Sequence, residues 1–305
     1  MLIVSARIFD KALTILFMLV ICSCVKQVDL DFEDYQTHPV VNALLVPDSV
    51  MAVHLSLSSR ADKPEVFPEL TRAKVEISDG TSSIELANQG NGTYSAGYYP
   101  IAGKEYKLSI HLDNENSLKS VTKIPVQPEI SITPIVAEHL VQVNIKDNRE
   151  ETNYYWIGLK SFSISNKMMY YKTYVSCDFL LLDDFNRTQG NGLSKTKYSY
   201  HFYARLPDYK FNGGQISFTL PHYWSDPQDY EFLSYRSYIY IINADEHLDR
   251  YMKSALIQYD LRVIGDMPVF HTPINMYSNI ENGKGIFGSY TMSQFDITTP
   301  SILRL

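Results

Sequence analysis

From about residue 38, apolar and polar side chains alternate in short runs that end at turn-forming residues. In the run MAVHLSLS the alternation places Val53, Leu55 and Leu57 on one side. Because the side chains of a strand point alternately to the two faces of its sheet, this period of two predicts half-buried β-strands. Short alternating strands with regularly spaced turns are typical of an antiparallel sandwich, so we expect an immunoglobulin-like sandwich over residues 38–126.

The segment PVQPEI, residues 125–130, carries two prolines and marks the expected end of this sandwich. Beyond it the composition changes, because residues 128–305 hold 18 of the 23 tyrosines. Runs such as NYYWIGLKSFSI and YEFLSYRSYIYII read as strands and predict a larger β domain over residues 127–305. The expected fold is therefore mainly β, with an N-terminal immunoglobulin-like antiparallel β-sandwich followed by a larger Tyr-rich β domain with one or two helices.

One helix is predicted within the second domain. Between Leu248 and Tyr259, apolar side chains recur every three or four positions, which gives a helix one apolar face. Asn243 and Glu246 are spaced as a capping pair for its amino end. We interpret the tyrosines on this face as core residues rather than as a platform for a ligand.

The amino terminus has the features of a secretory signal peptide. Arg7 and Lys11 precede the apolar run ALTILFMLVICSC, which is shorter than the roughly 20 residues that span a bilayer. The end of this run, ICSC, resembles a bacterial lipobox and predicts cleavage before Cys24, followed by acylation of that cysteine. Residues 1–23 would then be a lipoprotein signal peptide. An ordinary signal peptide with a chance cysteine, or an uncleaved anchor, is the alternative.

Residues 24–37 follow the lipidated cysteine and are rich in acidic side chains. We interpret them as a solvated tether between the body of the protein and the membrane. Acidic residues soon after such a cysteine also resemble the export signal of surface lipoproteins in Bacteroidota, although Lys26 and Gln27 come first here. The expected location is the outer membrane, through acyl chains on Cys24, with the body at the cell surface.

Charge and cysteine content exclude several classes of function. The net charge of −7 disfavours nucleic acid as a partner, because its phosphates would be repelled. Of three cysteines, Cys22 is removed with the signal peptide and Cys24 carries lipid, which leaves Cys177 alone. No disulfide framework and no cysteine metal site is therefore expected, and Cys177, within an apolar run, is interpreted as a core thiol.

Residues 281–290, ENGKGIFGSY, contain the G-x-G-x-x-G pattern of a dinucleotide-binding loop. Such a loop must open a helix and be followed by an acidic residue about 20 positions later. The Ser-, Thr- and Pro-rich stretch after Gly288 has no helical periodicity, so we interpret the glycines as a tight turn between strands.

Three polar residues in DEHLD lie close in sequence, namely Asp245, His247 and Asp249. On a helix, neighbours two positions apart point about 200° from each other, and the second histidine of H-E-x-x-H is missing. We interpret these residues as a solvated helix start. No catalytic residue, no metal site and no cofactor is predicted.

The tyrosine-rich composition offers candidate binding residues. Tyrosine and tryptophan at a surface give broad contact area for a protein or a sugar. The candidates are Tyr154, Tyr155, Trp156, Tyr223 and Trp224. The alternative is that these side chains fill half-buried strands, which tyrosine also favours.

Along nearly its whole length the chain resembles the domain-of-unknown-function 4249 family of Bacteroidota lipoproteins. The resemblance rests on the lipobox and acidic stretch, on HPVVNALLVPDS and PIAGKEYKLSI, on INADEHLDRYMKS, and most specifically on PINMYSNIENGKGIFGSY. Members of this family are commonly found with TonB-dependent outer-membrane receptors, and no activity or ligand is assigned to them. The resemblance implies an accessory protein of outer-membrane uptake or assembly.

Together these features predict a non-catalytic outer-membrane lipoprotein that serves as an accessory or ligand-binding partner of a TonB-dependent receptor. A free-standing adhesin that binds a glycan or a protein is the alternative. A hydrolase is a third hypothesis, and it would need two carboxylates that converge in a deep cleft only in the folded chain.

Overall fold

The computed structural model describes residues 36–59, 67–113, 117–163, 168–170, 185–188, 195–198, 203–222, 235–263 and 275–298. Residues 37–305 belong to one compact unit. All elements described here belong to the unit that begins at Thr37. The expected signal peptide, Cys24 and Cys177 lie outside the described residues.

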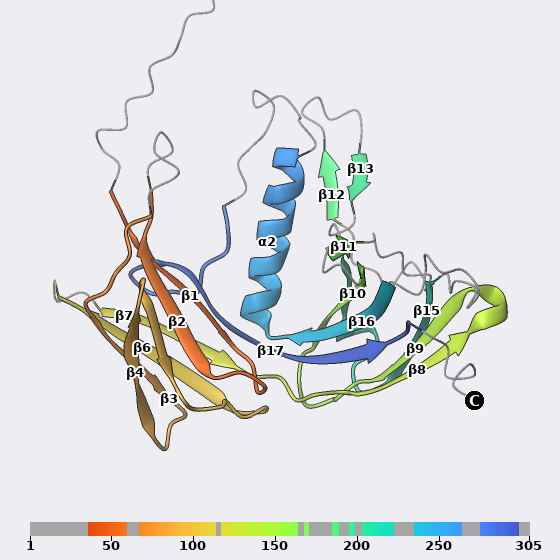
Figure 1. The fold of residues 1–305 in the computed structure, drawn as a ribbon, viewed down its shortest axis with the longest axis horizontal. Coiled ribbons are helices and arrows are strands. Elements are labelled where there is room, and N and C mark those ends of the chain that lie inside the picture. The colour runs from red at the N-terminus through yellow and green to blue at the C-terminus, as the bar shows by residue number, and fades with distance from the viewer. Residues whose placement is uncertain are drawn as a thin grey trace, which may run out of the picture. The chain divides into compact units, whose positions relative to one another are not determined.

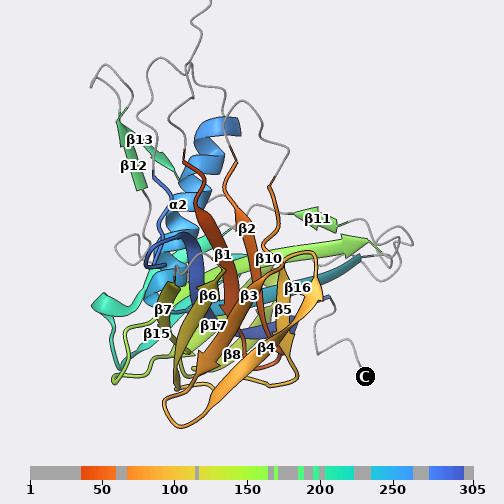
Figure 2. The same ribbon diagram turned by 90° about the vertical axis from the view of Figure 1, so that its left-hand side faces the viewer.

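The first seven strands are β1 (Pro39–Leu45), β2 (Met51–Leu57), β3 (Ala73–Ser78), β4 (Ser83–Gly90), β5 (Thr93–Ala96), β6 (Glu105–Leu112) and β7 (Ser117–Lys123). They pair antiparallel in the order β1-β2-β5-β4-β3-β6-β7 (Figures 1 and 2). The alternation seen in the sequence is confirmed in β2, where Val53 and Leu55 are buried and Leu57 is half-buried. One hydrophobic core fills this region.

The later strands are β8 (Glu129–Ile135), β9 (Leu140–Lys146), β10 (Tyr154–Ser163), β11 (Met168–Tyr170), β12 (Phe185–Thr188), β13 (Lys195–Tyr198), β14 (Tyr203–Pro207), β15 (Gln215–Pro221), β16 (Tyr235–Ala244) and β17 (Lys284–Asp296). The helical elements are the 3-10 turns η1 (Val136–Glu138) and η2 (Asp208–Lys210) and the α-helix α2 (Glu246–Val263). Strands β15, β9 and β8 form a sheet of their own, and β12 pairs with β13. The expected mainly β fold is confirmed.

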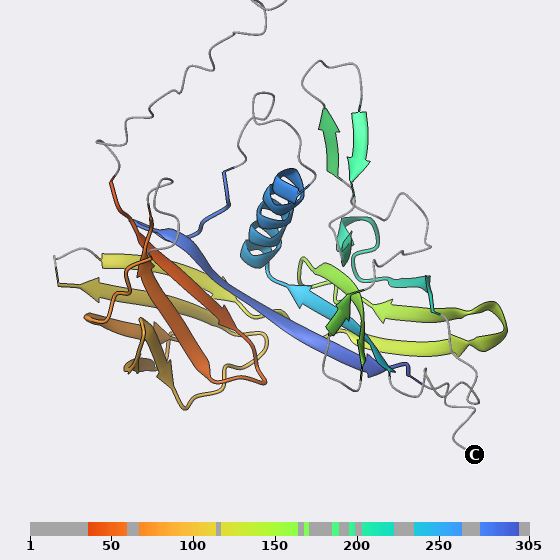
Figure 3. The same ribbon diagram turned by 45° about the horizontal axis from the view of Figure 1, so that its top comes forward.

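The last strand, β17, belongs to both halves of the chain. Its first part runs parallel to β1, and its second part runs antiparallel to β16, which pairs in turn with β10 (Figure 3). Phe287 fills the core under β1–β7, while Ile297, just beyond the strand, fills the core between β10 and β16 and the β8–β9–β15 sheet. The proline segment at 125–130 therefore lies between two hydrophobic cores, and the end of the chain contributes a side chain to each of them.

The glycines of the G-x-G-x-x-G pattern permit close packing of β17. A Cβ at Gly285, where φ is +104°, would lie 2.0 Å from the carbonyl oxygen of Val41. A Cβ at Gly288 would lie 3.1 Å from the Cβ of Leu248 in α2. The sequence predicted a turn, but Gly285 and Gly288 lie within strand β17. Glycine is needed at these two positions because the backbone of β1 and the start of α2 leave no room for a side chain.

The predicted helix is present as α2, but its cap differs from the expected one. Asp245 caps the helix, since its Oδ1 accepts the N–H of Leu248 at 2.8 Å. Asn243 is instead buried in β16 and donates to the carbonyl of Val126 and to Oδ1 of Asn153. Among the described residues, no helix is long and apolar enough to span a membrane.

Candidate binding cleft

The candidate aromatic residues from the sequence are mostly not at the surface. Tyr155 and Trp156 are fully buried, and Tyr154 is half-buried with the Arg205 guanidinium 5.3 Å from its ring centroid. Strand β10 is covered on both faces, so Tyr155 packs in one core and Trp156 in another. The expectation that these two side chains offer a contact surface is therefore corrected. Tyr223 and Trp224 lie outside the described residues.

Both buried aromatics carry hydrogen bonds that hold the fold. Tyr155 donates its hydroxyl to Asp147, and burial raises the pKa of that hydroxyl far above its ordinary value. Trp156 donates Nε1–H to Oδ1 of Asp249 at 2.9 Å. Each polar tip is thus used inside the protein, as is usual for buried tyrosine and tryptophan.

A buried ion pair fixes helix α2 to strand β14. Arg205 donates Nε–H to Oδ1 of Asp249 at 2.6 Å and Nη2–H to Oδ2 at 2.7 Å, and the two side chains are 6% and 3% exposed. This two-pronged geometry matches the planar guanidinium to the carboxylate. Asp249 was expected to be solvated, but it anchors the first turn of α2 to the β10–β14 region.

Asp245 joins strands β7 and β17 to the start of the same helix. In addition to capping α2, it accepts hydrogen bonds from the Thr122 hydroxyl in β7 at 2.5 Å and from the Ser289 N–H in β17 at 3.2 Å. The residue is only 8% exposed, and burial raises the pKa of its carboxyl. The prediction of a solvated helix start at DEHLD is therefore wrong, because Asp245 and Asp249 are both buried and accept several hydrogen bonds from other elements.

A second acidic pair lies in the interior near β10. Asn153 bonds to both members, with its Nδ2 3.1 Å from Oδ1 of Asp147 and its backbone N 2.7 Å from Oδ2 of Asp208. Burial raises the pKa of Asp208, which is 1% exposed, whereas Asp147 is 7% exposed. These carboxylates are engaged in holding loops and do not line the cleft described next. Among the described residues, no cluster of three or more His, Cys, Asp or Glu side chains could hold a metal ion.

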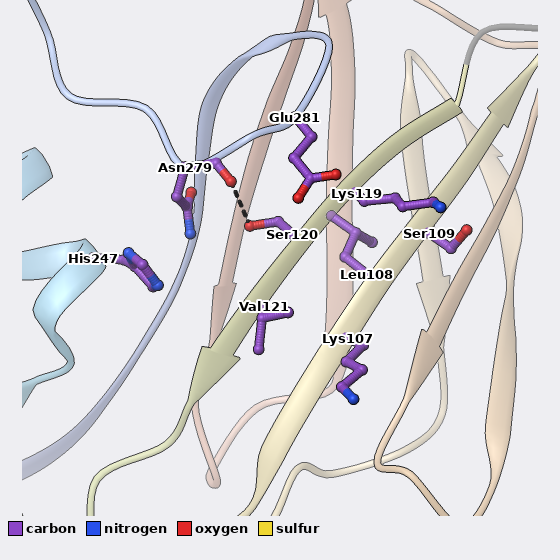
Figure 4. A pocket seen from close by; sticks show the side chains of 9 residues that line it. All are labelled: Lys107, Leu108, Ser109, Lys119, Ser120, Val121, His247, Asn279 and Glu281. Carbon is purple, nitrogen blue, oxygen red and sulfur yellow. Dashed lines mark hydrogen bonds between the residues drawn. The ribbon is translucent and has the colours of Figure 1, made fainter.

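An open cleft of about 420 Å³ lies where β6 and β7 meet the start of α2 and the segment before β17 (Figure 4). Pockets that hold small ligands are typically about 300–1,000 Å³. The lining residues are Lys107, Leu108, Ser109, Lys119, Ser120, Val121, His247, Asn279 and Glu281. Strands β6 and β7 contribute one wall, and His247, Asn279 and Glu281 contribute the other (Figure 4).

Strand β7 is the end strand of its sheet, and three of its outward-facing carbonyls are already bonded. Antiparallel pairing leaves every second residue of an edge strand with its N–H and C=O pointing away from the neighbouring strand. On β7 the carbonyls of Ser117, Lys119 and Lys123 accept hydrogen bonds from Asn282 Nδ2, Glu281 N and Ser289 Oγ, at 3.1, 2.9 and 2.9 Å respectively.

Val121 lies in the gap between these bonds. It has the same orientation as Lys119 and Lys123, so its N–H and C=O point away from β6 into the cleft. Within the described part of the chain these two groups have no hydrogen-bond partner. Its side chain is 41% exposed, on the outer face of the sheet. Among the outward-facing residues of β7, Val121 is the one whose carbonyl as well as N–H has no partner in the described chain.

The opposite wall of the cleft is fixed by its own hydrogen bonds. Asn279 donates Nδ2–H to the carbonyl of Phe287 at 2.7 Å and accepts the Phe287 N–H at 3.0 Å, which ties this wall to β17. The Ser120 hydroxyl donates to the Asn279 carbonyl at 2.9 Å. His247 Nδ1 lies 2.7 Å from the Tyr277 hydroxyl, with the two rings stacked. The gap beside Val121 is thus bounded by bonded segments.

The charged side chains of the cleft form few interactions with the rest of the described chain. Within the described chain, Lys119 and Glu281 form no salt bridge, although their backbones form an antiparallel bridge. Lys107 lies 3.7 Å from Glu105, and both side chains are more than half exposed, so this pair holds the lysine weakly. An ammonium group and a carboxylate are therefore available to a partner in the cleft, beside the open backbone of Val121.

The profile of the family described as Domain of unknown function (DUF4249) matches residues 25–296. The chain belongs to the DUF4249 family. The resemblance seen in the sequence is thereby confirmed, and the matched range includes all the residues that line the cleft. A search of curated proteins found no match for this DUF4249 protein.

Sequence reasoning did not identify the cleft. Its walls come from residues 107–121, 247 and 279–281, which only the folded chain brings together. The one available signal was the segment PINMYSNIENGKGIFGSY, which was the most specific part of the family resemblance and contains Asn279 and Glu281. The open backbone of Val121 has no signature in the sequence, because it depends on where neighbouring segments stop pairing.

Proposed function

We propose that this DUF4249 protein is a non-catalytic lipoprotein of the outer membrane, exposed at the cell surface and anchored through Cys24. In this proposal it acts as an accessory or ligand-binding partner of a TonB-dependent receptor. The lipobox-like ICSC and the acidic stretch after it support the anchor and the location. The choice of partner follows from the association with such receptors that the sequence resemblance implies.

The structural observation behind a binding role is the cleft with its unpaired backbone position. The N–H and C=O of Val121, together with Lys119 and Glu281, offer donors and acceptors that the described chain does not use itself. The acids whose pKa values are raised, Asp208 and Asp245, form interior hydrogen bonds that hold loops, strands and helix together. The buried carboxylates are used to hold the fold, whereas the polar groups at the edge of β7 are available to a partner. This arrangement favours a binding function over a catalytic one.

Affinity purification from detergent-extracted outer membrane tests this function. The tagged full chain is compared with its Cys24→Ala variant, which cannot be acylated at that position. We expect a large barrel receptor to be recovered with the wild-type chain in near-equal amount, and to be lost or strongly reduced with the variant. Recovery of the mature chain as an unpartnered soluble periplasmic protein would contradict the proposal. A clean membrane-bound monomer would favour the free-standing adhesin.

A further inference from the structure

We propose that the open edge of β7 is a docking site for an extended segment of a partner protein, which adds as a short strand at Val121. The segment presents an apolar side chain over Val121 and acidic side chains on either side of it. This inference rests on the proposed function and specifies where and how the partner is recognised.

The backbone of Val121 carries the first part of the argument. Its outward N–H and C=O can exchange a reciprocal pair of hydrogen bonds with one residue of an incoming strand, as in any antiparallel ladder. The chain itself uses the same mode two residues away, where the segment containing Glu281 forms an antiparallel bridge with Lys119. The fold thus already uses backbone pairing on this edge of β7.

The side chains around Val121 define the chemistry of the partner. Lys107 lies directly opposite on β6, and Lys119 and Lys123 lie two positions away on β7, so all three share the outer face with Val121. A residue added opposite Val121 presents its side chain on that same face, with its diagonal neighbours within reach of these lysines. Lys119 forms no salt bridge in the described chain and Lys107 is held only weakly by Glu105. Lys123, in contrast, is already paired with Glu151 at 2.8 Å. An exposed valine beside two available ammonium groups matches a segment with an apolar residue next to acidic ones.

The same lysines disfavour a second copy of this chain as the occupant. If two β7 edges paired antiparallel about Val121, Lys119 of one copy would lie opposite Lys123 of the other in both directions. Like charges directly opposite each other on a sheet are destabilising. Lysine on an exposed edge is also a common protection against self-pairing. Although Lys123 is paired with Glu151, Lys119 forms no salt bridge in the described chain and favours an acidic partner over a second copy of the chain.

The cleft also limits how long the added strand can be. On one side Glu281 donates its N–H to the carbonyl of Lys119, and on the other the Ser289 hydroxyl donates to the carbonyl of Lys123. The vacant length is that of one ladder residue and its immediate neighbours, at about 3.4 Å per residue. The partner therefore contributes a short extended segment rather than a long strand.

A peptide titration tests the mode of binding. The probe is the peptide Thr-Glu-Thr-Val-Thr-Glu-Thr, in which the valine and both glutamates project from one face of a strand. It is added to the purified chain carrying Cys24→Ala, and amide NMR shifts report the dissociation constant and the place of binding. Two matched probes have lysine in place of glutamate, or an N-methyl group on the valine amide.

We expect shifts centred on β7, binding weakened about tenfold by N-methylation, and little binding of the lysine peptide. Equal binding of all three peptides, or shifts away from β7, would overturn the inference. So would absence of any shift at saturating peptide. Self-association of the chain through β7 would overturn it as well, because the site would then belong to a second copy.

Two pairs of variants place the effect on the proposed atoms. Val121→Pro removes the outward N–H without removing a bond to β6, and Val121→Thr keeps that N–H with a similar side-chain volume. Lys119→Glu reverses a charge in the cleft, and Lys146→Glu makes the same change on a 69% exposed lysine of β9. We expect only the proline and Lys119 variants to weaken the peptide about tenfold. Unchanged affinity in both would refute the inference, and the N-methylated probe retains the test if the proline variant does not fold.

The membrane purification separates this inference from the proposed function. Recovery of the receptor with the wild-type chain and with Val121→Pro alike would retain the function and reject the docking site. Peptide binding at β7 with no receptor recovered would retain the site and reject the proposed partner class.

Discussion

Replacing Asp245 by alanine should loosen the cleft by separating its two walls. This carboxylate caps α2 through the Leu248 N–H and also binds Thr122 of β7 and Ser289 of β17. Helix α2 carries His247 on one wall of the cleft, and β7 is the other wall. One side chain thus holds both walls in register.

The expected loss of stability follows from these contacts. Losing an N-cap costs about 0.5–2 kcal/mol, and leaving a buried donor unsatisfied costs about 1–3 kcal/mol. The Thr122 hydroxyl retains a partner in the Ser289 hydroxyl at 2.9 Å, so mainly the Ser289 N–H is left without one. Together these terms predict that Asp245→Ala lowers the free energy of unfolding by about 2–5 kcal/mol.

Asp245→Asn is the matched control, because an asparagine also caps helices and accepts both backbone N–H groups. Burial raises the pKa of Asp245 above its ordinary value of 3.8, with the Thr122 hydrogen bond opposing that shift. Its contribution to stability is therefore fully present below pH 3.8 and declines as the pH rises through the higher folded-state pKa. In the asparagine variant this decline should be missing.

Urea unfolding of the Cys24→Ala chain and the two variants at neutral pH measures these differences, and repeating it at acidic pH measures the decline. A loss below about 1 kcal/mol for alanine would refute the reasoning, because it would mean that the contacts of Asp245 are replaced or unimportant. An asparagine variant as unstable as the alanine variant would also refute it.

Three further predictions test other parts of the fold. Gly285→Ala should lower the melting temperature strongly, because its Cβ would lie 2.0 Å from the Val41 carbonyl oxygen at a φ of +104°; thermal unfolding measures this, and an unchanged midpoint would contradict the close approach. Burial lowers the pKa of His222 from 6.5 to about 4, so the free energy of unfolding should fall by up to about 3 kcal/mol as the pH drops from 6.5 towards 4. Urea unfolding across this range measures the change, and the free energy of unfolding of His222→Gln should depend less steeply on pH. Trp156→Phe should cost about 1–3 kcal/mol by leaving Asp249 without the Nε1–H bond, and a loss no larger than that of a surface substitution would show that the bond is dispensable.

The local sequence pattern predicted the strands and the helix correctly, but it did not predict which other parts of the chain would pack against them. The period of two gave the strands of the first region, as in β2, and the helical spacing after Leu248 gave α2. Both patterns depend only on which face of one element is buried. They can therefore be recognised from the sequence of that element alone.

The cap of α2 shows where local reasoning fails. Asn243 and Asp245 are both favourable capping residues, and the spacing to Glu246 favoured the former. The choice is made by tertiary contacts, since Asn243 bonds across to Asn153 while Thr122 and Ser289 converge on Asp245.

Tyr155 and Trp156 show the same limit for the candidate site. Consecutive aromatic residues on a strand point to opposite faces, so one of them is expected at a surface unless both faces are covered. Here one core lies on each side of β10, with α2 packed on the side of Trp156. On the side of Tyr155 the cover is the separate β8–β9–β15 sheet, and on the side of Trp156 it is Leu248 of α2, which lies about 90 positions later in the chain.

A photo-crosslink from position 121 tests the central claim most directly. The full, membrane-anchored chain carries a photoreactive phenylalanine analogue in place of Val121, and a second version carries it in place of the exposed Lys146 of β9 as control. The account predicts that irradiation of intact outer membrane joins position 121, but not position 146, to a barrel receptor. A crosslink only to a second copy of the chain, or equal crosslinking from both positions, would contradict it.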